Sequence, residues 1–310
     1  MQAYEERGVA ETDMVRPRPL MRRSIRRDAR SLAPSDNRLA DFAPPHSSRE
    51  HGAKLGARST AVTRKAGHPV KVRNSIALVT GANRGLGRVF CHGFLQNGAA
   101  KVYAAARDPG QIHMSGVVPI RLDVTSISDV LEAADVCRDV TILVNNAGVL
   151  RDSAMLGEGS EEAARQEMET NFFGPLSIVQ RFAPVLAANG GGAIVNILSV
   201  ASWFTNPSMA TYCASKAAAQ VLTDAIRMQL RNKGTRVIGV YAGYIDTDMA
   251  SHVNTRKTAP MQVVERTLAA LESGMDRVFA DDRATYIDQR VRADPEAFYA
   301  ELQKHWDATR

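Results

Sequence analysis

A glycine-rich turn between an apolar run and a helix-like stretch constrains this chain more than any other feature. Residues 75–80 (SIALVT) are typical of a buried strand, and GANRGLG follows at 81–87. A helical pattern runs from there to Gly98. Glycines let a backbone approach a pyrophosphate, and the N-terminus of a helix offers unpaired N–H groups. Strand, turn and helix in this order predict a dinucleotide-phosphate cradle, whereas three glycines alone would also suit an ordinary turn.

The second predicted strand indicates which dinucleotide is bound. It spans residues 100–105, about twenty residues after the turn, where an acidic residue holds the ribose 2′-hydroxyl in dinucleotide-binding folds. Here Arg107 follows the strand, and the first carboxylate is Asp108. Arg107 and Arg84 of the turn can both pair with a 2′-phosphate, which favours NADP(H) over NAD(H). The alternative is that both arginines are ordinary solvent-exposed side chains.

Tyr212 and Lys216 stand four residues apart, so a helix over 212–232 would place phenol and ammonium on one face. A free tyrosine, with a pKa of about 10, is a poor base at neutral pH, and a neighbouring ammonium favours the phenolate. Ser199, thirteen residues before the tyrosine, can polarise a carbonyl oxygen while the tyrosine moves its proton. The three side chains predict carbonyl/alcohol redox chemistry, although Tyr and Lys at this spacing are common in helices.

Strand-like and helix-like segments alternate along the remaining chain. Apolar runs predict strands near 117–122, 140–145, 192–198, 235–241 and 277–280, and a helix is expected over 160–188. The alternation favours an α/β fold, a doubly wound Rossmann fold whose seven-stranded, mostly parallel sheet has helices on both faces. We expect one such catalytic domain over residues 75–310. The polar residues 246–260 predict a lid over the substrate or simply a long mobile loop.

Further motifs complete a pattern across roughly residues 75–250. They are LDVT (122–125), NNAG (145–148), Asn171 within ETNFFG, Ser199 within VNILS, YCASK (212–216) and AGYIDTDM (242–249). Together with TGANRGLG at 80–87, in this order and at this spacing, they resemble the short-chain dehydrogenase/reductase (SDR) family.

The resemblance implies a catalytic set of four residues. It makes Tyr212 the general acid/base, while Lys216 lowers its pKa and binds the nicotinamide ribose. Ser199 orients the substrate oxygen, and Asn171 holds a water that links Lys216 to solvent. Hydride moves to or from the nicotinamide as the tyrosine moves the matching proton. The cofactor NADP(H) is expected to contact Tyr212, Lys216 and residues of the turn and strand ends, namely Gly81, Asn83, Arg84, Gly85, Leu86, Gly87, Arg107, Asp123, Val124, Asn145, Ala147, Gly148, Ile245 and Thr247.

Two departures from the family pattern bear on assembly and substrate. Ala242-Gly243 stands where the family usually has Pro-Gly, which frees the backbone slightly. The residues from Arg277 lead into a charged, helix-like tail through Phe298 and Trp306 instead of the strand that packs between subunits in tetrameric members. A homo-oligomer is therefore expected to be a dimer rather than the usual tetramer. The same ending argues against a 3-oxoacyl-acyl-carrier-protein reductase.

These residues predict an NADP(H)-dependent oxidoreductase that interconverts a ketone or aldehyde and an alcohol. The side chains expected around a small-molecule substrate are mostly apolar and favour a hydrophobic carbonyl compound or secondary alcohol; they are Val149, Leu150, Met155, Trp203, Phe204, Met209 and Tyr244. A catalytically silent, NADP-sensing regulator on the same fold is the alternative. Such a protein would be expected to lose the tyrosine or the lysine, and both are present.

The basic charge of the chain is concentrated in its first 74 residues. Of the chain's 39 Lys and Arg and 33 Asp and Glu, residues 1–74 hold 16 and 8, which leaves 23 and 25 for residues 75–310. The catalytic domain thus gives no reason to expect a nucleic-acid partner. Residues 1–74 have no apolar periodicity and several prolines, so we expect a disordered extension. An inert or upstream extension, an organelle-targeting peptide and a polyanion-binding arm remain open.

No run of apolar residues is long enough to predict a membrane span. The three cysteines form no CxxC pair and no secretory signal is evident, so reduced thiols and a cytoplasmic location are expected. The histidines show no metal-ligand spacing, and this chemistry requires no metal, so no metal site is expected.

Overall fold

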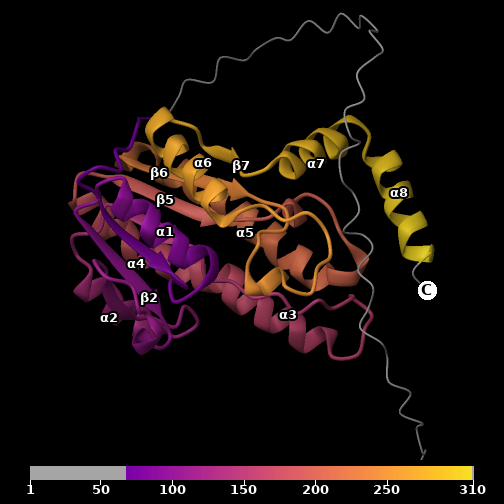
Figure 1. The fold of residues 1–310 in the computed structure, drawn as a ribbon, viewed down its shortest axis with the longest axis horizontal. Helices are drawn as coiled ribbons and strands as arrows, with labels where there is room; N and C mark the ends of the chain where they lie inside the picture. Colours follow the sequence, from indigo (N-terminus) through magenta and orange to yellow (C-terminus); the bar gives the residue numbers. More distant parts are fainter. Residues whose placement is uncertain (1–67, 309–310) are drawn as a thin grey trace, which may run out of the picture. The chain divides into compact units, whose positions relative to one another are not determined.

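The computed structural model describes residues 68–308 of the 310-residue chain, and in this part seven strands form one sheet. Every neighbouring pair is parallel, in the order β3-β2-β1-β4-β5-β6-β7 (Figure 1). The strand bounds are β1 Ile76–Thr80, β2 Lys101–Ala106, β3 Val118–Arg121, β4 Ile142–Asn145, β5 Gly192–Ile197, β6 Thr235–Tyr241 and β7 Arg277–Phe279. The expected doubly wound Rossmann fold is confirmed, with strand order reversing between β1 and β4.

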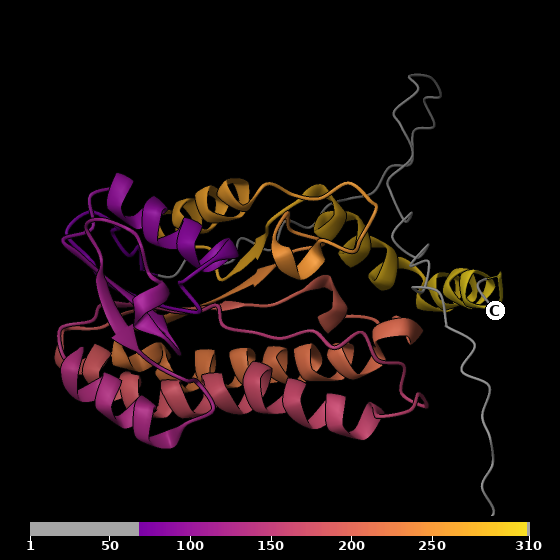
Figure 2. The same ribbon diagram turned by 60° about the horizontal axis from the view of Figure 1, so that its bottom comes forward.

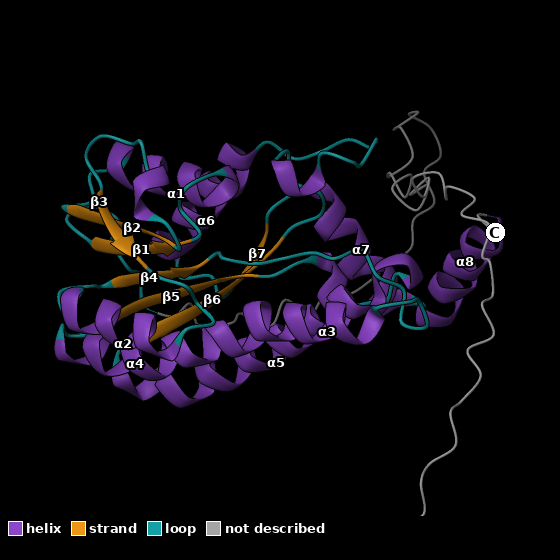
Figure 3. Ribbon diagram, turned by 90° about the horizontal axis from the view of Figure 1, so that it is seen from below, coloured by secondary structure: helices purple, strands orange, loops and turns teal. Residues whose placement is uncertain are grey.

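Helices cover both faces of the sheet (Figure 3). Helices α1 (Gly85–Gln96) and α6 (Pro260–Ser273) pack on one face, and α2 (Ile127–Val136), α4 (Gly174–Ala188) and α5 (Ala210–Leu230) pack on the other. Because strand side chains alternate, Ala77 and Val79 lie in the core on the face covered by α1 and α6, and Leu78 lies in the core on the opposite face. In a parallel sheet that is buried on both faces, the side chains that point to either face must be apolar. The strands of such a sheet are therefore continuous apolar runs in the sequence.

The segment predicted as a helix over 160–188 is helical throughout, but it is not regular. It consists of α3 (Ser160–Met168), one wide π-helical turn at Glu169–Phe173 and then α4. Asn171 lies inside the wide turn. Single π turns of this kind are frequent at functional sites, and apolar periodicity carries no signal for them.

Residues 68–74 belong to the packed domain. Val72 is fully buried in the core, and the Val70 amide donates to the Leu271 carbonyl at 2.9 Å. The packed domain therefore begins before the boundary expected at residue 75. The disordered extension predicted from the sequence otherwise falls on residues 1–67, which lie outside the part of the chain that the structure describes.

The tail is helical, as expected from the sequence. Helices α7 (Asp282–Ala293) and α8 (Pro295–Ala308) follow β7 (Figures 1 and 2). Phe298 and Leu302 of α8 are buried against Leu198 and Tyr241, next to the ends of β5 and β6. Within residues 68–308, no helix is both long and apolar enough to cross a membrane.

Candidate active site

A cavity of about 1370 Å³ opens at the carboxyl ends of the strands. Its walls include the residues that directly follow β2, β3, β4, β5 and β6. Pockets for one small ligand are typically 300–1,000 Å³, so this cavity has room for a dinucleotide and a second molecule. Most of the predicted site residues line it: Gly81, Asn83, Arg84, Gly85, Leu86, Arg107, Asp123, Val124, Ala147, Gly148, Ser199, Tyr212, Lys216, Ile245 and Thr247.

Gly87, Asn145 and Asn171 are not among the lining residues. The reasons for Gly87 and for Asn145 are different. A Cβ on Gly87 would lie 2.2 Å from the Gly81 carbonyl oxygen, so this glycine lets α1 pack tightly on the turn. Asn145 is the last residue of β4 and points into the interior, where its Nδ2 donates to Asn196 Oδ1 at 2.8 Å. Both therefore support the site from behind.

The glycine-rich turn has the form of a phosphate cradle. Gly81 and Gly85 adopt positive φ angles of 65° and 52°, a region that other residues enter at a cost. Helix α1 begins at Gly85 with no side-chain cap from the described residues and no acidic residue in its first turn. Its leading N–H groups and positive dipole end therefore face the cavity, which fits a pyrophosphate.

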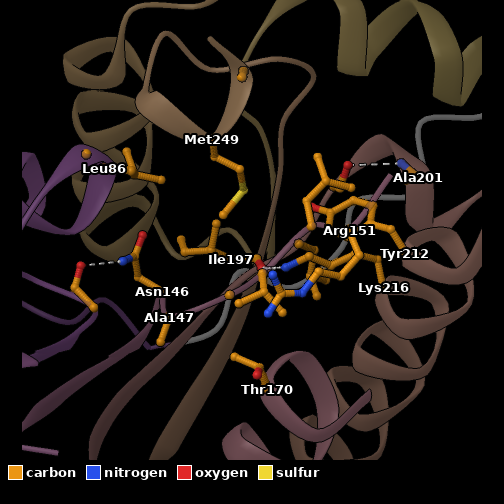
Figure 4. Close-up of a pocket in the computed structure, with 18 of the residues that line it drawn as sticks. Leu86, Asn146, Ala147, Arg151, Thr170, Ile197, Ala201, Tyr212, Lys216 and Met249 are labelled. Atoms are coloured by element: carbon orange, nitrogen blue, oxygen red, sulfur yellow. Dashed lines mark hydrogen bonds between the residues drawn. The ribbon is translucent and has the colours of Figure 1, made fainter. Parts of the chain in front are cut away.

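Asn146 fixes the shape of this turn, and sequence reasoning did not assign it a role. Its Nδ2 donates to the carbonyl oxygens of Thr80 at 2.8 Å and Gly81 at 3.3 Å (Figure 4). Its own amide donates to Thr80 Oγ1 at 3.0 Å. The second asparagine of NNAG thus ties β4 to the cradle, and only the doubled asparagine in the motif could have indicated it.

The two arginines expected at a 2′-phosphate are placed differently. Arg107 follows β2 at the cavity wall. Arg84 donates from Nη1 to Asp248 Oδ2 at 3.0 Å, so its guanidinium is joined to the loop that follows β6. Both arginines line the cavity, and Arg84 has an alternative anionic partner within the protein.

Ser199 and Tyr212 are brought together by β5 and α5. Ser199 directly follows β5 and accepts a hydrogen bond from the Ala201 amide at 3.1 Å, and its own hydroxyl donates to the Ala242 carbonyl at 3.4 Å. Tyr212 lies in the first turn of α5 and is 9% exposed. Burial raises the pKa of the Tyr212 phenol, and the nearby Ser199 hydroxyl partly opposes that rise.

Lys216 lies one turn further along α5, as its spacing predicted. Its Nζ donates to the Ile197 carbonyl at 3.0 Å and lies 5.6 Å from the centroid of the Tyr212 ring (Figure 4). Burial lowers the pKa of Lys216 to about 8. The ammonium was expected to lower the pKa of the tyrosine. In the structure, burial of the phenol is the larger effect and acts in the opposite direction.

Asn171 connects three parts of the site. Its Oδ1 accepts from the Val149 amide at 2.9 Å, and its Nδ2 donates to the Val149 carbonyl and to Ser215 Oγ, each at 2.9 Å. Ser215 Oγ in turn donates to the Tyr212 carbonyl at 2.8 Å. The Asn171 side chain therefore fastens the segment after β4 to the first turn of α5.

The substrate side of the cavity is largely apolar. Five of the expected side chains line it: Val149, Leu150, Phe204, Met209 and Tyr244. Met155 and Trp203 do not. Met155 is half exposed, and Trp203 stacks on Tyr241 at a centroid distance of 4.4 Å.

Other lining residues were not predicted. They include residues of α3, such as Glu162, Arg165 and Gln166, and residues of the segment after β4 and of the tail helices, namely Arg151, Arg283, Ile287, Phe298 and Leu302. Arg283 holds its guanidinium 5.2 Å from the centroid of the Tyr244 ring. The amphipathic pattern of α7 and α8 marks their apolar faces, but nothing in the sequence shows that these faces reach the cavity.

The loop expected to act as a lid lies beside the cavity and is fastened to both of its sides. A β-bridge joins Ile245 to Thr258 at its base. Asp248 pairs with Arg84 at 3.0 Å, and His252 Nε2 lies 2.9 Å from Asp152 Oδ2. The loop therefore connects the glycine-rich turn to the segment that follows β4.

A doubly wound sheet with a phosphate cradle and a Ser, Tyr and Lys group in one pocket defines a nicotinamide-dependent oxidoreductase. The comparisons are more specific: the chain belongs to the short-chain dehydrogenase family, whose model matches residues 75–258. Members of this family act on CH–OH and C=O groups with a nicotinamide dinucleotide.

Similar proteins include enzymes and solved structures. A short chain dehydrogenase from Burkholderia cenocepacia J2315, solved in complex with NADP, is 42% identical, with a TM-score of 0.73 over 75% of this chain and 98% of that one. The bovine "Dehydrogenase/reductase SDR family member 7B" is 30% identical over 243 residues, which are 68% of this chain and 74% of the relative. The 3-oxoacyl-acyl-carrier-protein reductase FabG of Staphylococcus aureus strain Mu50 is 29% identical over 68% of this chain and 92% of its own length.

Proposed function

We propose that this protein is an NADP(H)-dependent oxidoreductase that interconverts a ketone or aldehyde and an alcohol, with Tyr212 as general acid/base. The observation that carries the proposal is that the Ser199, Tyr212 and Lys216 side chains line the same cavity as the glycine cradle, with the Lys216 ammonium 5.6 Å from the centroid of the Tyr212 ring. A general acid and a second donor directed at one point are what a carbonyl oxygen needs when it becomes an alcohol.

Each side chain has a distinct task. The nicotinamide, when bound, supplies or accepts the hydride. Tyr212 gives its phenolic proton to the substrate oxygen during reduction and takes it back during oxidation. Ser199 donates to the same oxygen and fixes its position. The Lys216 ammonium lies 5.6 Å from the centroid of the tyrosine ring, and its positive charge favours the phenolate. We assign to Asn171 the water through which Lys216 reaches solvent.

NADP(H) is the cofactor that the side chains favour. Arg84 and Arg107 line the cavity near the cradle, and the segment after β2 has no carboxylate before Asp108 to receive a ribose 2′-hydroxyl. The 42% identical short chain dehydrogenase was solved with NADP, which supports the same preference. The cradle residues, the Asp123-Val124 pair and the Ile245 and Thr247 pair complete the proposed binding site.

A hydrophobic carbonyl compound or secondary alcohol is the proposed substrate. The substrate side of the cavity presents Leu150, Phe204, Met209 and the tail residues Ile287 and Phe298. Apolar walls of this kind stabilise an apolar ligand through the surface that it buries, at about 25 cal/mol per Å². The cysteines described in the structure are buried free thiols, which is compatible with the cytoplasmic location that we propose.

A dimer is the proposed assembly. The segment after β7 forms α7 and α8, which pack on the ends of β5 and β6. It does not provide the strand that joins subunits in tetrameric members of the family. Light scattering of the purified protein, coupled to size exclusion, tests this proposal. A tetramer would contradict it.

One observation favours the alternative of a silent NADP sensor: burial raises the pKa of Tyr212, which opposes its use as a base. Both functions require NADPH binding, and only the enzyme requires turnover. The test is a titration of the protein with NADPH and NADH by nicotinamide fluorescence, followed by a panel of apolar ketones and aldehydes monitored at the nicotinamide absorbance. Tyr212→Phe should bind NADPH like the wild type and lose turnover by orders of magnitude. Tight binding without turnover by the wild type on the whole panel would favour the sensor.

A further inference from the structure

Glu167 is a buried carboxyl group for which the proposed chemistry has no use. It lies on α3, one helical turn before Asn171, and its side chain is completely inaccessible to solvent. Carboxyl groups are seldom fully buried without a specific arrangement of partners, because desolvation of the charged form is costly. The partners of Glu167 therefore indicate its task.

The bonds of Glu167 repeat those of Asn171 one turn away. Glu167 Oε1 accepts from the Arg151 amide at 2.7 Å, just as Asn171 Oδ1 accepts from the Val149 amide at 2.9 Å. Two side chains four residues apart on the helical stretch thus accept from backbone amides two residues apart in the segment after β4. The helical stretch and the segment are therefore joined at Val149 and at Arg151.

Both side chains are connected to the first turn of α5. Asn171 is connected through Ser215, which bonds to the Tyr212 carbonyl. Glu167 is connected through the segment that it binds, because Thr211, the residue before Tyr212, bonds to the Ser153 carbonyl with its amide at 3.3 Å and its hydroxyl at 3.2 Å. The backbone around Tyr212 is therefore held on both sides of the tyrosine.

We propose that Glu167 is a positioning residue for Tyr212: with Asn171 it locks the pocket segment Val149–Ser153 to the start of α5 and so fixes the phenol beside Ser199. The inference rests on the proposed function and extends it, because the reacting groups themselves do not include Glu167. The buried Oε2 has no hydrogen-bond partner among the described residues. Such an atom is better tolerated on a neutral acid than on a carboxylate.

The charge of Glu167 is the second part of its role. Burial raises the pKa of Glu167, and the facing titratable groups are Arg151 and Asp152 of the pocket segment and Tyr212 and Cys213 of α5. When Glu167 is ionised, its negative charge raises the pKa of Tyr212. A neutral side chain of the same shape removes this effect without loss of the bond to Arg151.

Three variants separate these roles. Glu167→Ala removes the bonds, Glu167→Gln keeps an oxygen for the Arg151 amide without a charge, and Glu158→Gln removes an exposed charge just before α3 as the matched control. Hydrogen exchange is followed in peptides covering residues 149–153, together with the pH profile of kcat/KM for alcohol oxidation and the NADPH dissociation constant.

We expect exchange at 149–153 to be at least tenfold faster in Glu167→Ala than in the wild type, with kcat reduced tenfold or more and NADPH affinity within threefold. Glu167→Gln should restore protection and most of the activity at neutral pH. The rising limb of its pH profile for alcohol oxidation, which reports formation of the phenolate, should move to lower pH by half a unit or more. The control should match the wild type throughout.

Wild-type exchange at 149–153 in Glu167→Ala, or an unmoved rising limb in Glu167→Gln with equal loss of activity in both variants, would overturn the proposal. Exchange does not depend on turnover. If the wild type turned over no carbonyl compound, the proposed function would fail, while the exchange data would still decide whether Glu167 holds the segment.

Discussion

The guanidinium of Arg84 lies 3.0 Å from the carboxylate of Asp248, and this ion pair joins the glycine-rich turn to the loop after β6. Both side chains are well exposed, at 66% and 72%, so the pair contributes little to the stability of the fold. It matters for binding instead, because Asp248 competes with a phosphate group for the positive charge of Arg84. Arg84 and Asp248 therefore connect cofactor choice to the position of the loop.

Arg84→Ala should weaken NADPH binding roughly tenfold, about 1.4 kcal/mol, and leave NADH binding nearly unchanged. Asp248→Asn should strengthen NADPH binding by up to about fivefold, since an exposed ion pair that no longer competes is worth at most about 1 kcal/mol. Fluorescence titration with both nucleotides measures each change. Equal losses for NADPH and NADH in Arg84→Ala would show that this side chain does not recognise the 2′-phosphate.

Ser199→Ala should reduce kcat by about a hundredfold or more, because one donor to the reacting oxygen is lost. The affinity for NADPH should not change, since Ser199 is assigned to the substrate. Ser202→Ala is the control from the same turn: its buried hydroxyl has no partner among the described residues and it is not assigned to the pocket. If both variants lost the same activity, the effect would belong to the turn and not to the Ser199 hydroxyl.

Lys216 should make stability depend on pH. Burial lowers its pKa to about 8 in the folded protein, against about 10.4 in an unfolded chain, so between these values the unfolded state binds more protons. The free energy of unfolding should therefore rise with pH relative to Lys216→Met, by about 2 kcal/mol between pH 7 and pH 10. Denaturant unfolding of both proteins across this range measures the difference. A constant difference would mean that Lys216 titrates normally.

Gly87→Ala should be strongly destabilising. The added Cβ would lie 2.2 Å from the Gly81 carbonyl oxygen, which is backbone and cannot move without opening the cradle. We expect a loss of more than about 2 kcal/mol in stability and of most nucleotide affinity. Gly190→Ala is the control, because its φ of 85° adds strain but no described heavy atom lies within 4 Å. That variant should lose about 1 kcal/mol and keep its affinity.

The sheet was predictable because each of its strands is a short apolar run flanked by helices, and a strand buried on both faces has no other pattern. The cradle and the Ser, Tyr and Lys group were predictable because their spacing follows the fold directly. Asn145 and Gly87 show the limit of that reasoning: the motif marks them, but only the structure shows that they face away from the cavity.

No sequence pattern indicates the contacts between segments that lie far apart in the chain. The bonds of Glu167 depend on where α3 lies against the segment after β4, and the stacking of Trp203 on Tyr241 removes an expected pocket residue. The pKa of Tyr212 was also predicted from its neighbour on the helix alone. Burial, which is a property of the whole pocket, decides its direction.

The two ends of the cavity are built by different stretches of the chain. The cradle comes from β1, β4 and α1, whereas Phe298 and Leu302 of α8, with Ile287 of α7, close the opposite end. The tail helices contribute no strand to the sheet and no side chain to the Ser, Tyr and Lys group, so substitutions on their cavity side can change which molecules are accepted while the chemistry is preserved. After a gene duplication, substitutions confined to α7 and α8 would be enough to give the two copies different substrates.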